Sequence, residues 1–106
     1  MIAIVDYGMG NLGSVEKALK HIGSDCVITS DASDLYDASG VILPGVGSFA
    51  PAMDELISRD LVMPLIEIAN SGKPFLGICL GMQFHPEKSG EAGLNILRKF
   101  VSETKA

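Results

Sequence analysis

The chain begins with MIAIVDYGMGN (residues 1–11), an apolar run that ends in an aspartate and a glycine-rich turn. A short apolar run bounded by turn residues is typical of a buried strand that delivers a loop. A helix is expected next, with Ser14 as its N-cap and Gly23 at its end. The apolar side chains of that segment fall on one helical face, at Val15, Ala18, Leu19 and Ile22.

Short apolar runs and helical patterns alternate along the rest of the chain. Three further runs predict buried strands, at residues 26–29, 41–43 and 75–78. Residues 53–66 carry a helical pattern that we interpret as one helix or two, interrupted near Pro64. A last amphipathic helix is expected over residues 94–101.

The predicted order, β-α-β-β-α-β-α, indicates an α/β fold in which a doubly wound parallel sheet carries helices on both faces. Sheets of this kind bind ligands beyond the carboxyl ends of their strands. We expect a single domain over residues 1–106, because the chain has the length of one modest domain and shows neither a linker nor a repeat.

The composition is that of a soluble protein, with 47% hydrophobic and 20% charged residues. A net charge of −5 argues against non-specific nucleic-acid binding, which depends on lysine and arginine. No apolar stretch approaches the roughly 20 residues of a membrane-spanning helix, and the N-terminus lacks a signal-peptide pattern. We therefore expect a cytoplasmic protein with neither a nucleic-acid nor a membrane partner.

Cys79 lies between two glycines in Gly77-Ile78-Cys79-Leu80-Gly81, directly after a predicted strand. A sharp turn from strand into helix forms a nucleophile elbow, because it lifts the thiol out of the sheet. The N-terminus of the helix lowers the pKa of such a cysteine and favours the reactive thiolate. An arbitrary free cysteine is more often buried and inert, and we keep that interpretation for Cys26. The glycine frame favours Cys79 as a nucleophile.

His85 and Glu87 lie two positions apart, so that their side chains point to the same side of an extended segment. The pair suits a base and its orienting carboxylate, because an imidazole needs an acceptor on its second nitrogen to hold its tautomer. A lone histidine is more often a surface or capping residue. His21, near a predicted helix C-terminus, keeps that interpretation.

Two glycine-rich turns follow predicted strands. The first, Tyr7-Gly8-Met9-Gly10-Asn11, matches neither the P-loop nor the full dinucleotide-binding pattern. The second, Pro44-Gly45-Val46-Gly47, can aim backbone N–H groups at a developing oxyanion, although most such turns are plain connections. We expect no cofactor and no metal.

Four segments, taken in order, resemble the glutamine amidotransferase subunits of imidazole glycerol phosphate synthases, which are class I glutamine amidotransferases. They are residues 4–12, 43–49, 73–83 and 83–90, and the resemblance as a whole extends over nearly the whole chain. The cysteine and His-Pro-Glu segments are shared by the class in general, whereas the two glycine-rich turns point to this kind of subunit. The resemblance implies a flavodoxin-like doubly wound sheet.

The same resemblance implies a glutaminase that releases ammonia from glutamine for a (β/α)8 cyclase subunit, its partner in a heterodimer of histidine biosynthesis. It implies that Cys79 attacks the side-chain amide of glutamine. His85 would then serve as base and acid, and Glu87 would orient His85.

The remaining site residues are also implied by the resemblance alone. The oxyanion hole of the family maps onto backbone N–H groups at Val46 or Gly47 and at Leu80. Its substrate contacts map partly onto Gly47 and Gln83.

The chain departs from the family pattern between its last two motifs. Several further strands separate the cysteine from the histidine in such subunits, whereas here His85 follows Cys79 by six positions. We interpret this spacing as a large internal deletion joined at Gln83, within one shortened domain. Two alternatives stay open: a catalytically inactive remnant or partial sequence of that subunit, and a small cysteine hydrolase or stress-type thiol protein.

Overall fold

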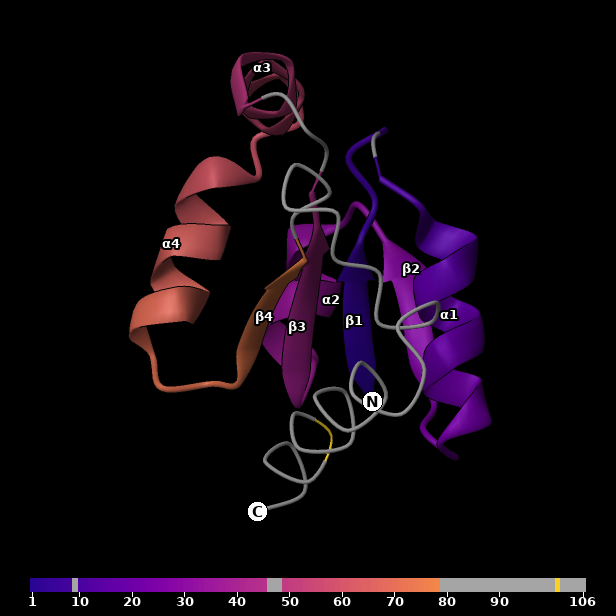
Figure 1. Ribbon diagram of the computed structural model, residues 1–106. Coiled ribbons are helices and arrows are strands. Elements are labelled where there is room, and N and C mark those ends of the chain that lie inside the picture. Colours follow the sequence, from indigo (N-terminus) through magenta and orange to yellow (C-terminus); the bar gives the residue numbers. More distant parts are fainter. Residues whose placement is uncertain (9, 46–48, 79–100, 102–106) are drawn as a thin grey trace.

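In the computed structural model, which describes residues 1–8, 10–45, 49–78 and 101, four parallel strands form one sheet (Figure 1). Their order across the sheet is β2-β1-β3-β4. The strands are β1 (Ile2–Val5), β2 (Cys26–Thr29), β3 (Gly40–Pro44) and β4 (Phe75–Ile78). All four lie where the apolar runs of the sequence predict strands, and the parallel sheet confirms the predicted α/β class.

Strand β1 lies inside the sheet and pairs with a neighbour on each side. Its four residues pair with all of β2, and residues 2–4 also pair with residues 40–42 of β3. Strand β3 then pairs with β4, from Val41 opposite Phe75 to Pro44 opposite Ile78. Every residue of β1 is buried, as expected for a parallel strand covered on both faces.

Helices cover both faces of the sheet, which confirms the doubly wound arrangement (Figure 1). They are α1 (Leu12–His21), α2 (Ala32–Asp37), α3 (Phe49–Ser58) and α4 (Val62–Asn70). On one face, Ile2 and Ile4 share an apolar cluster with α1. On the other, Ala3 and Val5 share a cluster with α2, α3 and α4. Because side chains alternate along a strand, β1 supplies both cores.

Helix α2 is absent from the order predicted from the sequence, and the structure corrects that order to β-α-β-α-β-α-α-β over the described residues. The helix has six residues, too few for a clear periodic pattern. Its N-cap is Asp31, whose carboxylate accepts a hydrogen bond from the Ser33 N–H at 2.9 Å. Leu35 is its buried anchor. A local cap and one apolar contact therefore suffice to form it.

The interruption between α3 and α4 lies at Asp60 rather than near Pro64. Asp60 has a φ of 55°, in the left-handed region, and it stands between the two helices. Pro64 is the third residue of α4, where a missing N–H removes no intrahelical hydrogen bond. The sequence pattern left one helix or two open; the structure has two, and the predicted interruption near Pro64 is wrong.

Lys73 ties α2 to the chain that enters β4. Its ammonium donates hydrogen bonds to the carbonyls of Leu35 at 3.1 Å and Tyr36 at 2.6 Å. These carbonyls lie in the last turn of α2, where a cation also interacts favourably with the helix dipole. The contact fixes the start of the strand that ends at Ile78.

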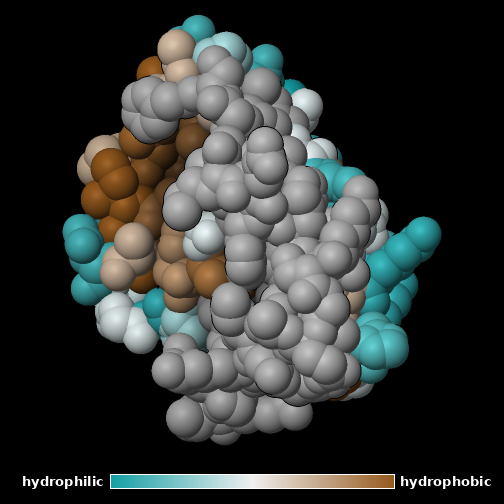
Figure 2. All heavy atoms as spheres, viewed as in Figure 1, coloured by the Kyte–Doolittle hydropathy of each residue, from teal (hydrophilic) through white to brown (hydrophobic). Residues whose placement is uncertain are grey.

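Exposed apolar side chains gather on the side of the molecule formed by α3 and α4 (Figure 2). Ile57, Met63 and Ile66 are all about half exposed or more, and a hollow of about 380 Å³ lies between the two helices.

None of the helices in the described part of the chain has the length and apolar character needed to cross a membrane. Of the last predicted helix, only Val101 lies within the described residues, where it is buried in the cluster with α1.

The N-cap of α1 is Asn11, and the sequence prediction of Ser14 is wrong. The Asn11 side chain accepts a hydrogen bond from the Ser14 N–H at 3.1 Å, so that Ser14 is the donor and already belongs to the helix. The predicted end is confirmed: the chain leaves the helix through Gly23, whose φ is +82°.

We predict that Asn11→Ala lowers the free energy of unfolding by about 1 kcal/mol, because the N–H of Ser14 loses its acceptor. Asn11→Asp restores an acceptor and should keep most of the stability. The matched control is Ser14→Ala, which should change stability by less than about 0.5 kcal/mol, since alanine is a good helix former. Urea unfolding of the three variants measures the effect. A larger loss for Ser14→Ala than for Asn11→Ala would contradict this cap.

Candidate functional site at the carboxyl ends of the strands

The carboxyl ends of all four strands lie at one edge of the sheet because the strands are parallel (Figure 1). From β1, the chain first adds β2 on one side and then β3 and β4 on the other. The direction of winding therefore reverses between β1 and β3, and doubly wound sheets bind their ligands at this reversal. The fold alone thus indicates the ends of β1 and β3 as the candidate site.

Strands β1 and β3 part at this edge. Their pairing ends with Ile4 opposite Ile42, although β3 continues to Pro44. On its other side, the chain stays with β2, because the N–H of Asp6 donates to the Thr29 carbonyl at 2.8 Å. The last residues of β3 consequently extend beyond the ladder that they share with β1.

The loop after β1 contacts the end of β3 through a tyrosine and a glycine. Tyr7 is buried, with 1% of its surface exposed, and its hydroxyl donates a hydrogen bond to the Pro44 carbonyl. Gly10 has a φ of +91°, and a Cβ placed on it would lie 2.8 Å from the Cβ of Pro44. Real Cβ atoms do not approach a neighbour this closely, so that only glycine fits without displacement. Both contacts converge on Pro44.

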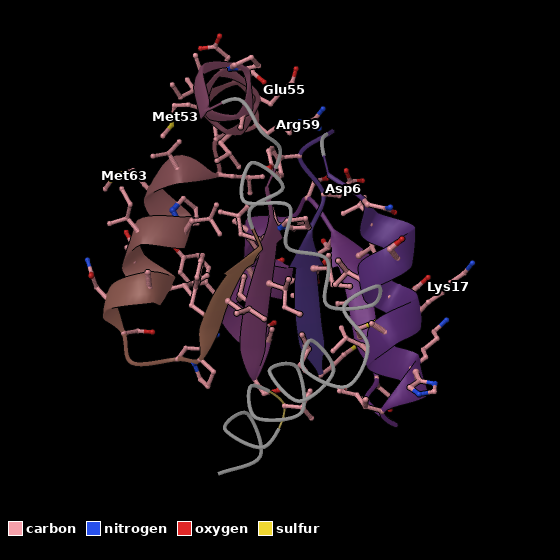
Figure 3. All side chains as sticks on the ribbon, in the orientation of Figure 1. Asp6, Lys17, Met53, Glu55, Arg59 and Met63 are labelled. Carbon is pink, nitrogen blue, oxygen red and sulfur yellow. The ribbon has the colours of Figure 1, made fainter. Side chains whose placement is uncertain are left out.

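An ion pair between Glu55 of α3 and Arg59, the residue directly after α3, lies over the same loop. The Arg59 guanidinium is 3.1 Å from the Glu55 carboxylate, and both side chains point toward the end of the sheet where Asp6 lies (Figure 3). A Cβ on Gly8 would lie 2.7 Å from Nη2 of Arg59. The N–H of Gly8 donates to the Asp6 carboxylate at 3.1 Å. Gly8 therefore lies between the Asp6 carboxylate, which accepts its N–H, and the Arg59 guanidinium, which packs against it.

All of the site residues predicted from the sequence lie outside the described residues: Val46, Gly47, Cys79, Leu80, Gln83, His85 and Glu87. For Val46 and Cys79, the preceding residue in the chain is described. Gly45 precedes Val46, and Ile78 precedes Cys79. Since Pro44 pairs with Ile78, the two segments begin from adjacent strands at the carboxyl edge.

The two residues that we expected to have no chemical role are described. Cys26 is half-buried in β2, and burial, followed by the nearby Glu16 carboxylate, raises the pKa of its thiol. A raised pKa keeps the thiol protonated, so that Cys26 is a poor nucleophile. His21 is exposed in the last turn of α1, as predicted for a residue at a helix end.

The sequence analysis missed the contacts made by Tyr7, Gly10, Glu55 and Arg59. The pair of Glu55 and Arg59 has a usable signal, because opposite charges four residues apart attract on one helix face. The bond from Tyr7 to Pro44 has none, since 37 positions separate the partners. The described part of the chain contains no group of three or more His, Cys, Asp or Glu residues that could hold a metal ion.

Comparison with known proteins gives a consistent set of similarities. The family described as Glutamine amidotransferase class-I matches residues 3–91. Imidazole glycerol phosphate synthase subunit HisH of Bacillus cereus (strain AH187) is 55% identical over 109 residues, covering 99% of this chain and 52% of that protein. The subunit of the same name from Bacillus thuringiensis (strain Al Hakam) is 54% identical, with the same coverage. The chain spans about half the length of the curated relatives it matches.

We predict that Gly10→Ala lowers the free energy of unfolding by about 1 to 3 kcal/mol, because the added methyl group meets Pro44 and the left-handed φ disfavours alanine. The matched control is Gly13→Ala in α1, where a Cβ would meet no atom within 4 Å. This control should leave stability unchanged or raise it by up to about 1 kcal/mol. Thermal and urea unfolding measure both variants. Equal stability of the two would show that the loop does not press on β3.

Proposed function

The chain belongs to the class I glutamine amidotransferase family, and on this premise we propose that it is the glutaminase component of an imidazole glycerol phosphate synthase. It hydrolyses glutamine to glutamate and ammonia. The observation that carries the proposal is the position of β4, which ends at Ile78, directly before Cys79, and beside Pro44 at the carboxyl edge. The identity of 55% to a HisH subunit over 99% of the chain supports the choice of substrate class.

In the proposed reaction, the Cys79 thiolate adds to the side-chain amide carbon of glutamine and forms a tetrahedral intermediate. His85 takes the thiol proton and returns it to the departing nitrogen, so that ammonia leaves and a thioester remains. Water, deprotonated by His85, then cleaves the thioester and releases glutamate. Glu87 accepts a hydrogen bond from the second ring nitrogen of His85 and stabilises the imidazolium.

Negative charge develops on the amide oxygen when the thiolate adds to the amide carbon. We propose that backbone N–H groups at Val46 or Gly47 and at Leu80 donate to this oxygen, and that Gly47 and Gln83 contact the substrate. The adjacent ends of β3 and β4 suit an oxyanion hole, because each strand end can supply one backbone donor. The residues that precede these two segments, Gly45 and Ile78, lie at the edge where doubly wound sheets bind ligands.

The partner and setting follow from the same proposal. The ammonia is delivered to a cyclase subunit in a heterodimer, in the cytoplasm, for histidine biosynthesis. The catalytic unit is one internally shortened domain of residues 1–106, in which His85 follows Cys79 by six positions.

A second candidate is a catalytically inactive remnant of the same subunit. It is favoured by the length of the chain, which spans about half of its curated relatives. A supporting shell of residues fixes catalytic groups to within about 0.5 Å, and a shortened chain supplies less of that shell. The two candidates differ in one measurable property, the release of glutamate.

We predict that the chain, mixed with the cyclase subunit of an imidazole glycerol phosphate synthase, releases glutamate from glutamine. Cys79→Ala should lower kcat by on the order of 10³-fold or more, because the nucleophile is lost. Cys26→Ala is the matched control and should retain activity, since its thiol lies in β2. An assay of glutamate formation distinguishes the variants. Equal rates for the wild-type chain and Cys79→Ala would favour the inactive remnant.

A glutamine analogue with an electrophilic side chain provides a second test. It should label Cys79 and leave Cys26 unmodified, because burial keeps the pKa of the Cys26 thiol raised. Mass spectrometry of tryptic peptides identifies the labelled residue. Peroxide oxidation of Cys79 without labelling by the analogue would instead indicate a thiol protein of another class.

A further inference from the structure

The Pro44 carbonyl lies where the ladder between β1 and β3 has already ended. The two strands pair only as far as Ile4 and Ile42, yet β3 continues for two more residues. Pro44 keeps its pairing with Ile78 on the side of β4. On the side of β1, the Tyr7 hydroxyl donates to its carbonyl and takes the place of a strand neighbour.

We propose that Tyr7 is a positioning residue for the oxyanion hole, a role that rests on the proposed glutaminase function. Its hydroxyl sets the orientation of the peptide between Pro44 and Gly45. This peptide leads, one residue later, into Val46 and Gly47. In this role, Tyr7 acts through the backbone of β3.

Because of the backbone geometry of proline, one hydrogen bond to the Pro44 carbonyl is enough to fix the orientation of the next peptide. The pyrrolidine ring fixes φ of Pro44 near −65°, so that ψ is the only soft torsion left at this residue. The peptide unit that follows is planar, and the Pro44 carbonyl and the Gly45 N–H therefore turn together. A bond to the carbonyl thus fixes the direction in which the chain leaves β3.

Gly10 restricts the same peptide from a second direction. A Cβ on Gly10 would lie 2.8 Å from the Pro44 Cβ and 3.4 Å from the Pro44 carbonyl oxygen. The loop after β1 therefore packs directly on Pro44, while the Tyr7 hydroxyl holds its carbonyl. Tyr7 itself is 1% exposed, and a buried phenol of this kind stays in place because its ring is packed and its hydroxyl is bonded.

The consequence for the rate follows from the short range of oxyanion stabilisation. Backbone donors act when they lie about 2.7 to 3.1 Å from the developing oxyanion, and a misplacement of about 1 Å can lower a rate on the order of 10²-fold. Substrate binding in the ground state depends much less on these donors. Loss of the Tyr7 hydroxyl should therefore affect kcat and leave KM nearly unchanged.

The test compares Tyr7→Phe with Tyr36→Phe in the full chain bound to the cyclase subunit. The Tyr36 hydroxyl donates to the Glu67 carboxylate at 2.7 Å on the exposed surface. Tyr36→Phe therefore removes the same hydroxyl group as Tyr7→Phe, but at a site where it bonds to α4 rather than to β3. We expect Tyr7→Phe to lower kcat by about 10-fold to 100-fold, with KM for glutamine changed by less than about threefold. Tyr36→Phe should leave both constants unchanged.

Two further readouts separate positioning from a general structural defect. Iodoacetamide alkylates Cys79 by direct displacement at a saturated carbon, which forms no oxyanion, so that Tyr7→Phe should leave this rate within about twofold of the wild type. Amide hydrogen exchange in peptides that contain Gly45 should become at least about tenfold faster in Tyr7→Phe than in Tyr36→Phe.

Each outcome decides a different point. If kcat of Tyr7→Phe equals that of Tyr36→Phe, the positioning role is wrong, whatever the exchange shows. An equal loss of glutaminase and alkylation rates also overturns it, because that pattern indicates a general defect. If the wild-type complex releases no glutamate, the proposed function fails. Faster exchange in Tyr7→Phe then still supports the anchoring of Pro44, and unchanged exchange overturns the anchoring as well.

A second variant covers the case in which circular dichroism shows that Tyr7→Phe does not fold. Gly10→Ala displaces Pro44 from the other direction and leaves the Tyr7 hydroxyl in place. It should give the same pattern of lowered kcat, unchanged KM and faster exchange at Gly45. An unchanged kcat in a folded Gly10→Ala variant, together with displaced backbone at Gly45, would overturn the proposal.

Discussion

The pairing of β1 with two parallel neighbours is the constraint on which the rest of the structure depends. A strand enclosed on both sides has its backbone groups satisfied within the sheet, and its side chains alternate between two cores. Ile2 and Ile4 supply the core under α1, while Ala3 and Val5 supply the core under the other helices. Both faces therefore need helices, and all carboxyl ends lie at one edge.

The candidate site is a consequence of that arrangement. The chain after β1 must turn toward one neighbour, and it follows β2 through the bond from Asp6 to Thr29. Among the described residues, this leaves the end of β3 without a strand partner on that side. Tyr7 and Gly10 contact Pro44 on that side, and the pairing of Pro44 with Ile78 places the ends of β3 and β4 side by side.

Local signals explain what the sequence could predict. Short apolar runs and turn glycines predicted the strands, and the motif resemblance predicted the family, which the match to residues 3–91 confirms. Asn11 and Ser14 are both good capping residues, so that apolar spacing could not choose between them. The break at Asp60 has no residue signature as conspicuous as Pro64. The bond from Tyr7 to Pro44 joins distant positions, and only the folded chain reveals it.

The order of the strands also has a consequence for synthesis on the ribosome. Strands β1, β2 and β3 have all been made by residue 44, whereas β4 begins at residue 75. At about 5 to 20 residues per second, the intervening segment takes roughly 2 to 6 seconds to translate. Once these three strands have left the ribosome, and until β4 follows after a similar delay, β3 is an open edge of a nascent sheet, and such edges recruit unrelated strands. A chaperone that binds emerging apolar chains would therefore have its main window of contact before β4 arrives.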